Sequence, residues 1–370
     1  MKRGQIKLII FVSVILIVAS VVLLMFRLMP ESPGAEVEYA RIALAEARDK
    51  KAETYSPKTY RQASAYYDSA MVHWKYQNSR FLFFRDYEKV VDFANLSAET
   101  ALKAGDQTTK SSASLKTRLE KSIKELNAIV SEINDRFTRY PLSSETRNRI
   151  ARGKLLLSEA NVAFRKGSYL QANRKISDAE PLLRDSFNNA VESLNDYFNS
   201  YPQWKSWADK TIAESRQKKT TAIIVDKIAG KCYLYQNGVK TNEFDAELGI
   251  KWTGDKRHRG DKATPEGMYT VTKKLEGGST KFYKALLINY PNAEDKKKFE
   301  EEIRRGTLPA SAKIGGLIEI HGSGGKGTDW TDGCVALVDS DMSKLYKLVK
   351  VGTPVTIVGS LEKLNSIKKN

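Results

Sequence analysis

Cysteine, histidine and acidic side chains are scarce in this 370-residue sequence, and each shortage excludes a class of protein. Two cysteines cannot build a disulfide scaffold or a cysteine-rich zinc module. Three histidines leave little for a polyhistidine metal site, so we expect no metal and no organic cofactor. The 44 acidic residues face 61 Lys and Arg residues, which gives a net charge of +17. That surplus favours polyanions such as anionic lipid or cell wall. No nucleic-acid-binding motif accompanies it, so we predict no nucleic-acid partner.

The sequence has one long apolar run, residues 8–26, which contains no charge. A helix needs about 20 such residues to cross a bilayer. A buried core helix and a cleaved signal peptide are the alternatives, but the apolar stretch of a signal peptide is about 7–15 residues long and ends at small residues. Here Arg27 to Pro30 follow instead, and most of the flanking positive charge precedes the run. We therefore predict that residues 1–30 are a cytoplasmic N-terminus and an uncleaved transmembrane anchor, with the remaining chain exported.

Glycine is nearly absent between residues 36 and 218, where only Gly105, Gly153 and Gly167 occur, whereas eighteen glycines follow Lys218. Because glycine is disfavoured inside helices and common in turns between strands, this shift predicts an α-helical region at 36–217 and a mostly-β domain at 219–360. The overall composition, 41% apolar and 28% charged, is that of folded protein. Residues 361–370 form a basic tail.

The helical region shows apolar stripes at the 3.6-residue period, which we interpret as core packing of a bundle or short solenoid. Two segments, beginning at Phe84 and Phe164, look alike and resemble the helical hairpins of tetratricopeptide-type arrays. We expect this region to act as a spacer or to bind a cell-envelope protein. The clearest stripes are Tyr60, Ala63, Tyr67, Ala70, Met71 and Trp74, then Phe84, Tyr87, Val91, Ala94, Ala98 and Ala101, and then Leu115, Leu119, Ile123, Leu126, Val130, Ile133 and Phe137.

The β-rich region carries one stretch with candidate chemistry, GGLIEIHGSGGKGTDWTDGC, at residues 315–334. A predicted strand delivers His321 to its end, and a glycine-rich loop then leads to Cys334. A cysteine nucleophile needs a nearby base, which an imidazole supplies. Gly333 permits a tight turn beside the sulfur, where backbone N–H groups can hold an oxyanion. A buried apolar cysteine and a structural histidine are the alternatives, but their pairing around one such loop favours catalysis.

These motifs resemble the L,D-transpeptidase (YkuD-type) family over about residues 219–360. The resemblance rests on HG followed by a loop and T-x-G-C, on GDKATPEGMY at 260–269, and on NYPN at 289–292. Many members read S-H-G-C-[IV]-[RN], so Thr331 replaces Ser, Asp332 occupies the variable position, and Ala336 replaces Arg or Asn. The ending GCVALVDSDM is similar to a YafK-like branch, some of whose members hydrolyse rather than crosslink.

The resemblance implies a fold and a reaction. It implies a mostly-β catalytic domain with small helices, in which Cys334 attacks the carbonyl between residues three and four of a peptidoglycan stem and releases D-alanine. His321 would take the thiol proton or hold the thiolate as an ion pair. The amides of Gly333 and Cys334 would form the oxyanion hole, and Gly322, Thr331 and Asp332 would line the substrate site.

An amine acceptor would then complete a crosslink, or water would release the trimmed stem. The alternatives are therefore a transpeptidase, an L,D-carboxypeptidase or amidase on the same substrate, and a non-catalytic wall-binding scaffold. The resemblance also implies a single-pass protein of the bacterial inner membrane with its catalytic domain outside the cytoplasm. Asp329 is a further candidate for local electrostatics, and Cys232, in the strand KCYLY, is expected to be a core residue.

Overall fold

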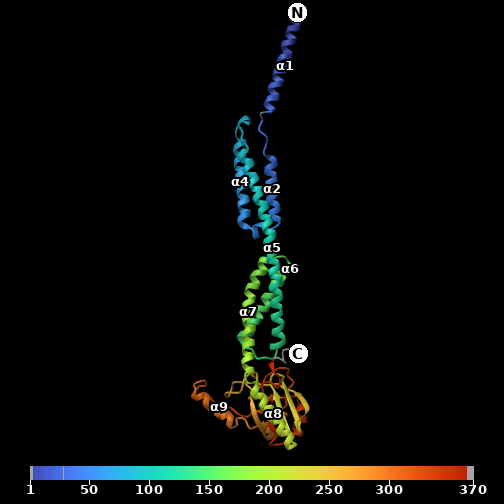
Figure 1. The fold of residues 1–370 in the computed structure, drawn as a ribbon, viewed down its shortest axis with the longest axis vertical. Helices are drawn as coiled ribbons and strands as arrows, with labels where there is room; N and C mark the ends of the chain where they lie inside the picture. Colours follow the sequence, from blue (N-terminus) through green and yellow to red (C-terminus); the bar gives the residue numbers. More distant parts are fainter. Residues whose placement is uncertain (1–2, 28, 365–370) are drawn as a thin grey trace. The chain divides into compact units, whose positions relative to one another are not determined.

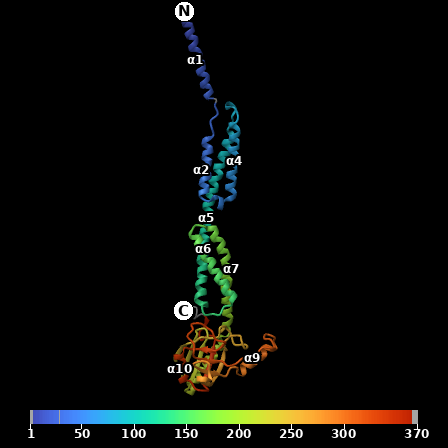
Figure 2. The same ribbon diagram turned by 180° about the vertical axis from the view of Figure 1, so that it is seen from behind.

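The computed structural model of the protein describes residues 3–27 and 29–364. Residues 1–2 and 28 of the predicted anchor, and residues 365–370 of the predicted basic tail, lie outside these described residues. The chain divides into two compact units, Met1–Ser122 with Ala163–Ala172, and Ile123–Val162 with Asn173–Asn370. Figure 1 and Figure 2 show the ribbon from two sides.

The first helix, α1 (Arg3–Arg27), contains the apolar run. Its segment Leu8–Arg27 is long and apolar enough to cross a membrane, with a mean hydropathy of 3.3, and none of it is buried against the protein. An apolar helix that finds no protein partner must bury its side chains elsewhere, and a bilayer offers that environment. The structure thus contains a candidate membrane span where the sequence predicts one.

The rest of the first unit is a helical bundle built mainly on alanine. It contains α2 (Gly34–Asp49), α3 (Ala52–Tyr55), α4 (Pro57–Asn78), the 3₁₀ turn η1 (Leu82–Phe84) and the start of α5 (Glu88–Phe137). Small side chains let these helices approach closely, and the core cluster consists of ten buried alanines with Val37, Tyr60 and Val90. The predicted placement of Phe84 on this buried face is wrong, because the helix begins only at Glu88 and Phe84 is 67% exposed.

The second unit joins the remaining helices to a sheet. Its helices are the end of α5, α6 (Ser144–Arg165), α7 (Tyr169–Phe198) and α8 (Tyr201–Lys218). The strands are β1 (Thr221–Asp226), β2 (Lys231–Gln236), β3 (Val239–Asp245), β4 (Gly267–Glu276), β5 (Lys284–Ile288), β6 (Glu319–His321), β7 (Val335–Ala336) and β8 (Pro354–Val358). Two short helices, α9 (Ala293–Arg304) and α10 (Asp339–Leu348), accompany the strands. The predicted fold class, helices followed by a mostly-β domain, is confirmed.

The eight strands form one sheet in the order β3-β2-β1-β8-β4-β5-β6-β7. The pairs are antiparallel except β1 with β8 and β6 with β7, which are parallel. Isolated bridges from Glu247 to Ala336 and from Gly249 to Thr331 join the chain after β3 to the β7 end. The sheet therefore curls until its two edges meet, which leaves fewer unpaired edge groups and encloses an apolar core.

Helix α8 packs directly on this sheet through Trp204. The indole is only 1% exposed and lies in a cluster with Phe198, Ile224 and Val358. Gly359 makes that approach possible, because a Cβ built there would lie 2.3 Å from the indole ring. Core packing thus continues from the helices into the β-domain across the predicted division at Lys218.

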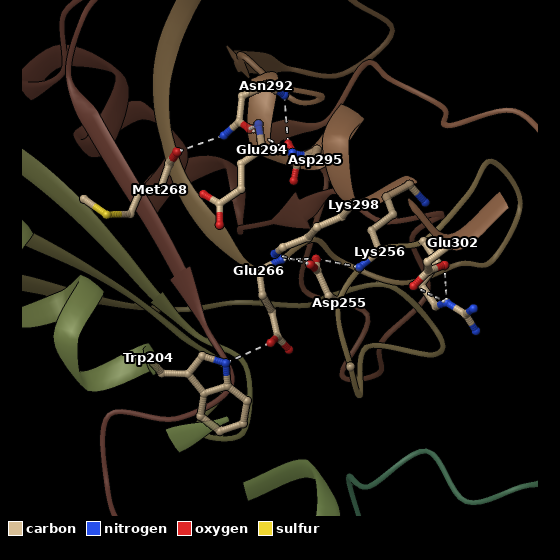
Figure 3. Close-up of polar contacts among 12 residues, drawn as sticks. Trp204, Asp255, Lys256, Glu266, Met268, Asn292, Glu294, Asp295, Lys298 and Glu302 are labelled. Carbon is tan, nitrogen blue, oxygen red and sulfur yellow. Dashed lines mark hydrogen bonds and ion pairs between the residues drawn. The ribbon is translucent and has the colours of Figure 1, made fainter. Parts of the chain in front are cut away.

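A buried ion pair lies under the same contact. The Lys227 ammonium, fully buried, donates to Glu266 Oε1 at 2.7 Å and to the carbonyls of Gly254 and Thr264. The Glu266 carboxylate also accepts from Trp204 Nε1 at 2.8 Å and from the Tyr197 hydroxyl at 2.7 Å. Figure 3 shows the Trp204 indole facing Glu266, with Asp255 and Lys298 alongside. Every donor of the ammonium is satisfied, which a buried charge requires.

Removing the Glu266 charge is therefore expected to destabilise the second unit. Glu266→Ala leaves the Lys227 ammonium buried and unpaired, and breaking a buried pair in this way costs about 3–5 kcal/mol. The free energy of unfolding in urea measures the loss. Glu266→Gln, which keeps an acceptor oxygen, should lose less. Equal, near-zero losses for both variants would show that the ion pair does not hold α8 to the sheet.

Candidate active site

A pocket of about 980 Å³ opens in the β-domain, and both His321 and Cys334 line it. Of the other predicted site residues, Thr331 and Asp332 also line this pocket. Gly333 and Gly322 are adjacent in sequence to the two key side chains. The structure thus places four of the six predicted site residues around a single cavity.

The pairing of two strands brings His321 and Cys334 together. Strand β6 ends at His321 and pairs in parallel with β7, with Ile320 opposite Val335 and His321 opposite Ala336. Cys334 immediately precedes β7. One residue at the end of β6 and one directly before β7 therefore come close in the fold, because the glycine-rich loop between them supplies the crossover.

The His321 ring is held by its neighbours on three sides. Its face stacks on Phe282 with ring centroids 3.5 Å apart and an interplanar angle of 8°, and Trp330 meets it edge-on at 6.0 Å. Its Nδ1 lies 2.6 Å from the Gly322 carbonyl oxygen. A carbonyl only accepts hydrogen bonds, so Nδ1 carries the proton. In the neutral ring Nε2 is then an unprotonated acceptor. That atom is buried and has no hydrogen-bond partner among the described residues.

Burial favours the neutral forms of both key groups. It lowers the pKa of His321 to about 4, and this effect exceeds the opposing one of the Gly322 hydrogen bond. Burial likewise raises the pKa of the Cys334 thiol to about 11, against the opposing hydrogen bond from the Glu319 backbone. The Sγ atom lies 3.7 Å from the Leu317 carbonyl oxygen, an acceptor for a thiol proton. At neutral pH the pocket therefore holds a protonated thiol and a neutral imidazole. Of the two expected roles for His321, this favours proton acceptor over ion-pair partner.

Thr331 shapes the turn before the thiol. It is buried, and its Oγ1 donates to the Cys334 carbonyl at 2.7 Å and accepts from the Gly333 N–H at 3.1 Å. Gly333 has φ +130°, and a Cβ there would lie 2.6 Å from the Ala263 carbonyl oxygen, so no other residue fits without strain. The Gly333 N–H is already engaged in this turn, and its role in an oxyanion hole stays a prediction. Asp332 is exposed.

Hydrogen bonds to the chain just after β3 fix the loop between β6 and β7. Glu247 accepts from the Gly327 N–H at 2.6 Å and from Trp330 Nε1 at 2.7 Å. The Asp329 carboxylate accepts from the Leu248 N–H at 2.8 Å and from Arg139 at 3.3 Å. Asp329 thus holds the loop in place and does not line the pocket. Gly322 is close-packed, since a Cβ there would lie 2.6 Å from an Asp339 carboxylate oxygen.

Sequence reasoning missed most of the residues that line the pocket, and two of them lie against the predicted site residues. Phe282, from the loop before β5, carries no motif that marks it as the partner of His321. Lys256 has a side chain only 3% exposed; its ammonium donates to Asp261 at 2.6 Å and lies 3.4 Å from a Cβ built on Gly333. Asp261 belongs to the GDKATPEG motif, which was a usable signal for this part of the site.

Cys232 lies in β2 and is completely buried, and burial raises its pKa to about 12. Both cysteines are free. Among residues 3–27 and 29–364, no group of three or more His, Cys, Asp or Glu side chains is arranged to hold a metal ion.

Comparison with known proteins identifies the β-domain. Residues 220–357 match the family described as the L,D-transpeptidase catalytic domain, YkuD. The resemblance predicted from the motifs is therefore confirmed for this domain. No protein of curated function matches the chain.

Several solved structures are similar to this domain. A structure of Bdellovibrio bacteriovorus Bd1075 is 24% identical over 41% of this chain and 54% of its own, with a TM-score of 0.31. An L,D-transpeptidase from Mycobacterium smegmatis is 14% identical over 37% of this chain and 58% of its own, with a TM-score of 0.25. An L,D-transpeptidase from Mycobacterium tuberculosis H37Rv is 16% identical over 38% of this chain and 57% of its own, with a TM-score of 0.26. The chain thus spans little more than half the length of these proteins.

Removing the Thr331 hydroxyl should loosen the turn that holds Cys334. Thr331→Val keeps the shape but leaves two buried polar partners unsatisfied, which costs about 1–3 kcal/mol. Urea unfolding measures the loss, and Thr331→Ser, which keeps the hydroxyl, is the matched control. A valine variant as stable as the serine variant would mean that the hydroxyl does not hold the turn.

The neutral thiol predicts a distinctive pH profile of alkylation. Because the Cys334 pKa is raised to about 11, the thiolate fraction is small at neutral pH and grows about tenfold per pH unit. The rate of iodoacetamide alkylation, followed by intact mass, should therefore climb without a plateau from about pH 6 to pH 9. A plateau across this range that disappears in His321→Ala would instead reveal a preformed thiolate–imidazolium pair.

Proposed function

We propose that this protein is a membrane-anchored L,D-transpeptidase that acts on peptidoglycan stem peptides through a Cys334 acyl-enzyme. The observation that supports it most is the pairing of a thiol with an imidazole whose free nitrogen is buried, both on one pocket of a domain that matches the L,D-transpeptidase family. The candidate membrane helix α1 supports the anchor, and the family supports action outside the cytoplasm.

In the proposed reaction, Cys334 Sγ attacks the donor carbonyl between stem residues three and four while His321 Nε2 takes the thiol proton. The tetrahedral oxyanion is held by the Cys334 N–H, since the Gly333 N–H already donates to Thr331 Oγ1. His321 then returns the proton to the leaving amine, the C–N bond breaks, and D-alanine departs from a thioester. An acceptor amine attacks the thioester, transfers its proton to Nε2, and regenerates the thiol as the crosslink forms.

The charge of the pocket supports a carboxylate-bearing substrate. Four cationic side chains line it, namely Lys256, Arg259, Lys273 and Lys281, against only Glu319 and Asp332. A surplus of positive charge in a cleft raises the local concentration of anionic ligands. Because Ala336 replaces the Arg or Asn common in the family, Arg259, Lys273 and Lys281 are the candidates for holding the stem peptide, whereas Lys256 is already paired with Asp261.

Hydrolysis of the same thioester by water is the second candidate function, and the YafK-like ending of the motif favours it. The two reactions share every step up to D-alanine release and differ only in the acceptor. A non-catalytic wall-binding scaffold is the third, and the built geometry around His321 Nε2 disfavours it.

Defined muropeptides distinguish these candidates. Full-length protein incubated with a tetrapeptide muropeptide should yield crosslinked dimers and free D-alanine, identified by mass spectrometry. Cys334→Ser should lose at least about 1,000-fold in rate, since the nucleophile of a covalent mechanism is removed. Cys232→Ser, the matched control at a buried strand position, should retain the activity.

If the products are trimmed monomers without dimers, the protein is a hydrolase and the proposed transpeptidase activity is wrong. Unchanged activity in Cys334→Ser, or an equal loss in both folded variants, would contradict the assignment of Cys334 as the nucleophile.

A further inference from the structure

The connection between α4 and α5 presents three phenylalanines to solvent. Phe81 and Phe84 are 69% and 67% exposed, and Phe83 is 37% exposed. Phe81 contacts both others, with ring centroids 5.9 Å and 6.1 Å away. Together with Leu82 they form one apolar wedge, which we call the aromatic tip (residues 81–84). The bundle core, which is built on alanine, makes no use of these rings.

The aromatic tip is a built feature. The Arg85 guanidinium donates to the carbonyls of Asn78 and Arg80, both at 3.1 Å. Gln77 Oε1 accepts from the Asp86 N–H, and Asn78 Oδ1 accepts from the Tyr87 hydroxyl. The polar groups at the base of the connection are thus satisfied by neighbouring residues, while the rings point outward. A segment that meets a nonpolar phase needs this arrangement, because unsatisfied polar groups are costly there.

The aromatic tip lies at the end of the bundle where α2 begins, as both views show (Figures 1 and 2). Arg48 donates to the Tyr60 hydroxyl and sets the two helices side by side at the opposite end. From Arg48 back to the first residue of α2 is fourteen residues, and from Tyr60 to the last residue of α4 is eighteen. At about 1.5 Å per residue, α4 therefore extends about 6 Å farther than α2. The tip therefore projects beyond the first residue of α2.

The chain connects that same end to the candidate membrane span. Only residues 28–33 separate the end of α1 from Gly34, and six residues span at most about 20 Å. With α1 in a bilayer, the start of α2 cannot leave the membrane surface by more than this. The aromatic tip, which projects past it, is then kept at a high effective concentration next to the lipid.

We propose that the aromatic tip inserts into the outer interface of the bilayer that α1 spans, as a second membrane contact of this protein. Phe and Leu side chains favour the headgroup–acyl boundary, and flanking arginines favour the headgroups. Arg80 and Arg85 flank the tip on both sides, while Asp86 and Glu88 follow at the start of α5. Because these charges nearly balance, the apolar wedge carries the binding. The inference rests on the anchor of the proposed function.

Nitroxide depth measurements on the full chain test this inference. All variants carry Cys334→Ser, so that the only native cysteine left is Cys232, which is buried and does not take the label. The nitroxide is attached to the tip through Phe84→Cys. Control labels are placed through Ser111→Cys, exposed farther along α5, and through Val14→Cys in α1. The protein is reconstituted in vesicles of phosphatidylethanolamine and phosphatidylglycerol. Collision rates with oxygen, which concentrates in lipid, and with a water-soluble nickel chelate are then compared.

The oxygen-to-nickel ratio at position 84 should exceed that at position 111 several-fold. Adding Phe81→Ser and Phe83→Ser should return the ratio toward the Ser111 value, whereas Phe81→Leu with Phe83→Leu should preserve it. Equal ratios at 84 and 111 while the Val14 label is buried in lipid would overturn the tip contact, leave the anchor intact and assign the rings to a protein partner. A Val14 label that also stays in water would overturn both.

Discussion

The parallel pairing of β6 with β7 is the constraint on which the candidate site depends. It puts His321, at the end of β6, close to Cys334, which directly precedes β7, although a thirteen-residue step separates them in the sequence. Two short strands would not hold that pairing alone. The Thr331 hydroxyl fixes the turn before the thiol. Glu247 and the Leu248 N–H, just after β3 at the opposite edge of the sheet, fix the loop, the latter through the loop's own Asp329. The curl of the sheet, which brings those edges together, is therefore also what assembles the site.

Burial of this pair has a chemical consequence. Desolvation disfavours charge on both groups, so in the resting site the Cys334 sulfur keeps its proton and His321 Nε2 is an unprotonated acceptor. Such a thiol is protected from indiscriminate oxidation and alkylation, since the thiolate is the reactive form. In the proposed reaction the proton moves only when a carbonyl is held in the pocket for attack. Selectivity for a bound donor follows from the same desolvation that suppresses background reactivity.

The sequence was sufficient for features with a local signature. The glycine shift at Lys218 separates helices from strands, and the HG and T-x-G-C motifs mark His321 and Cys334. Contacts between distant segments leave no such trace. Phe282 meets His321 from another hairpin, and Trp204 meets Glu266 across sixty-two positions. Phe84 fits a helical stripe by spacing, but Arg85 closes a loop there and turns the ring to solvent. Tertiary hydrogen bonds override local periodicity at such positions.

The acyl-enzyme itself gives the most direct test of the account. Full-length protein is mixed with a tetrapeptide muropeptide, quenched in acid within the first turnover, and analysed by intact mass and peptide mapping. The account predicts an added mass equal to the donor minus D-alanine, located on Cys334 and absent from His321→Ala at neutral pH. Turnover without any covalent adduct, or an adduct on another residue, would contradict it.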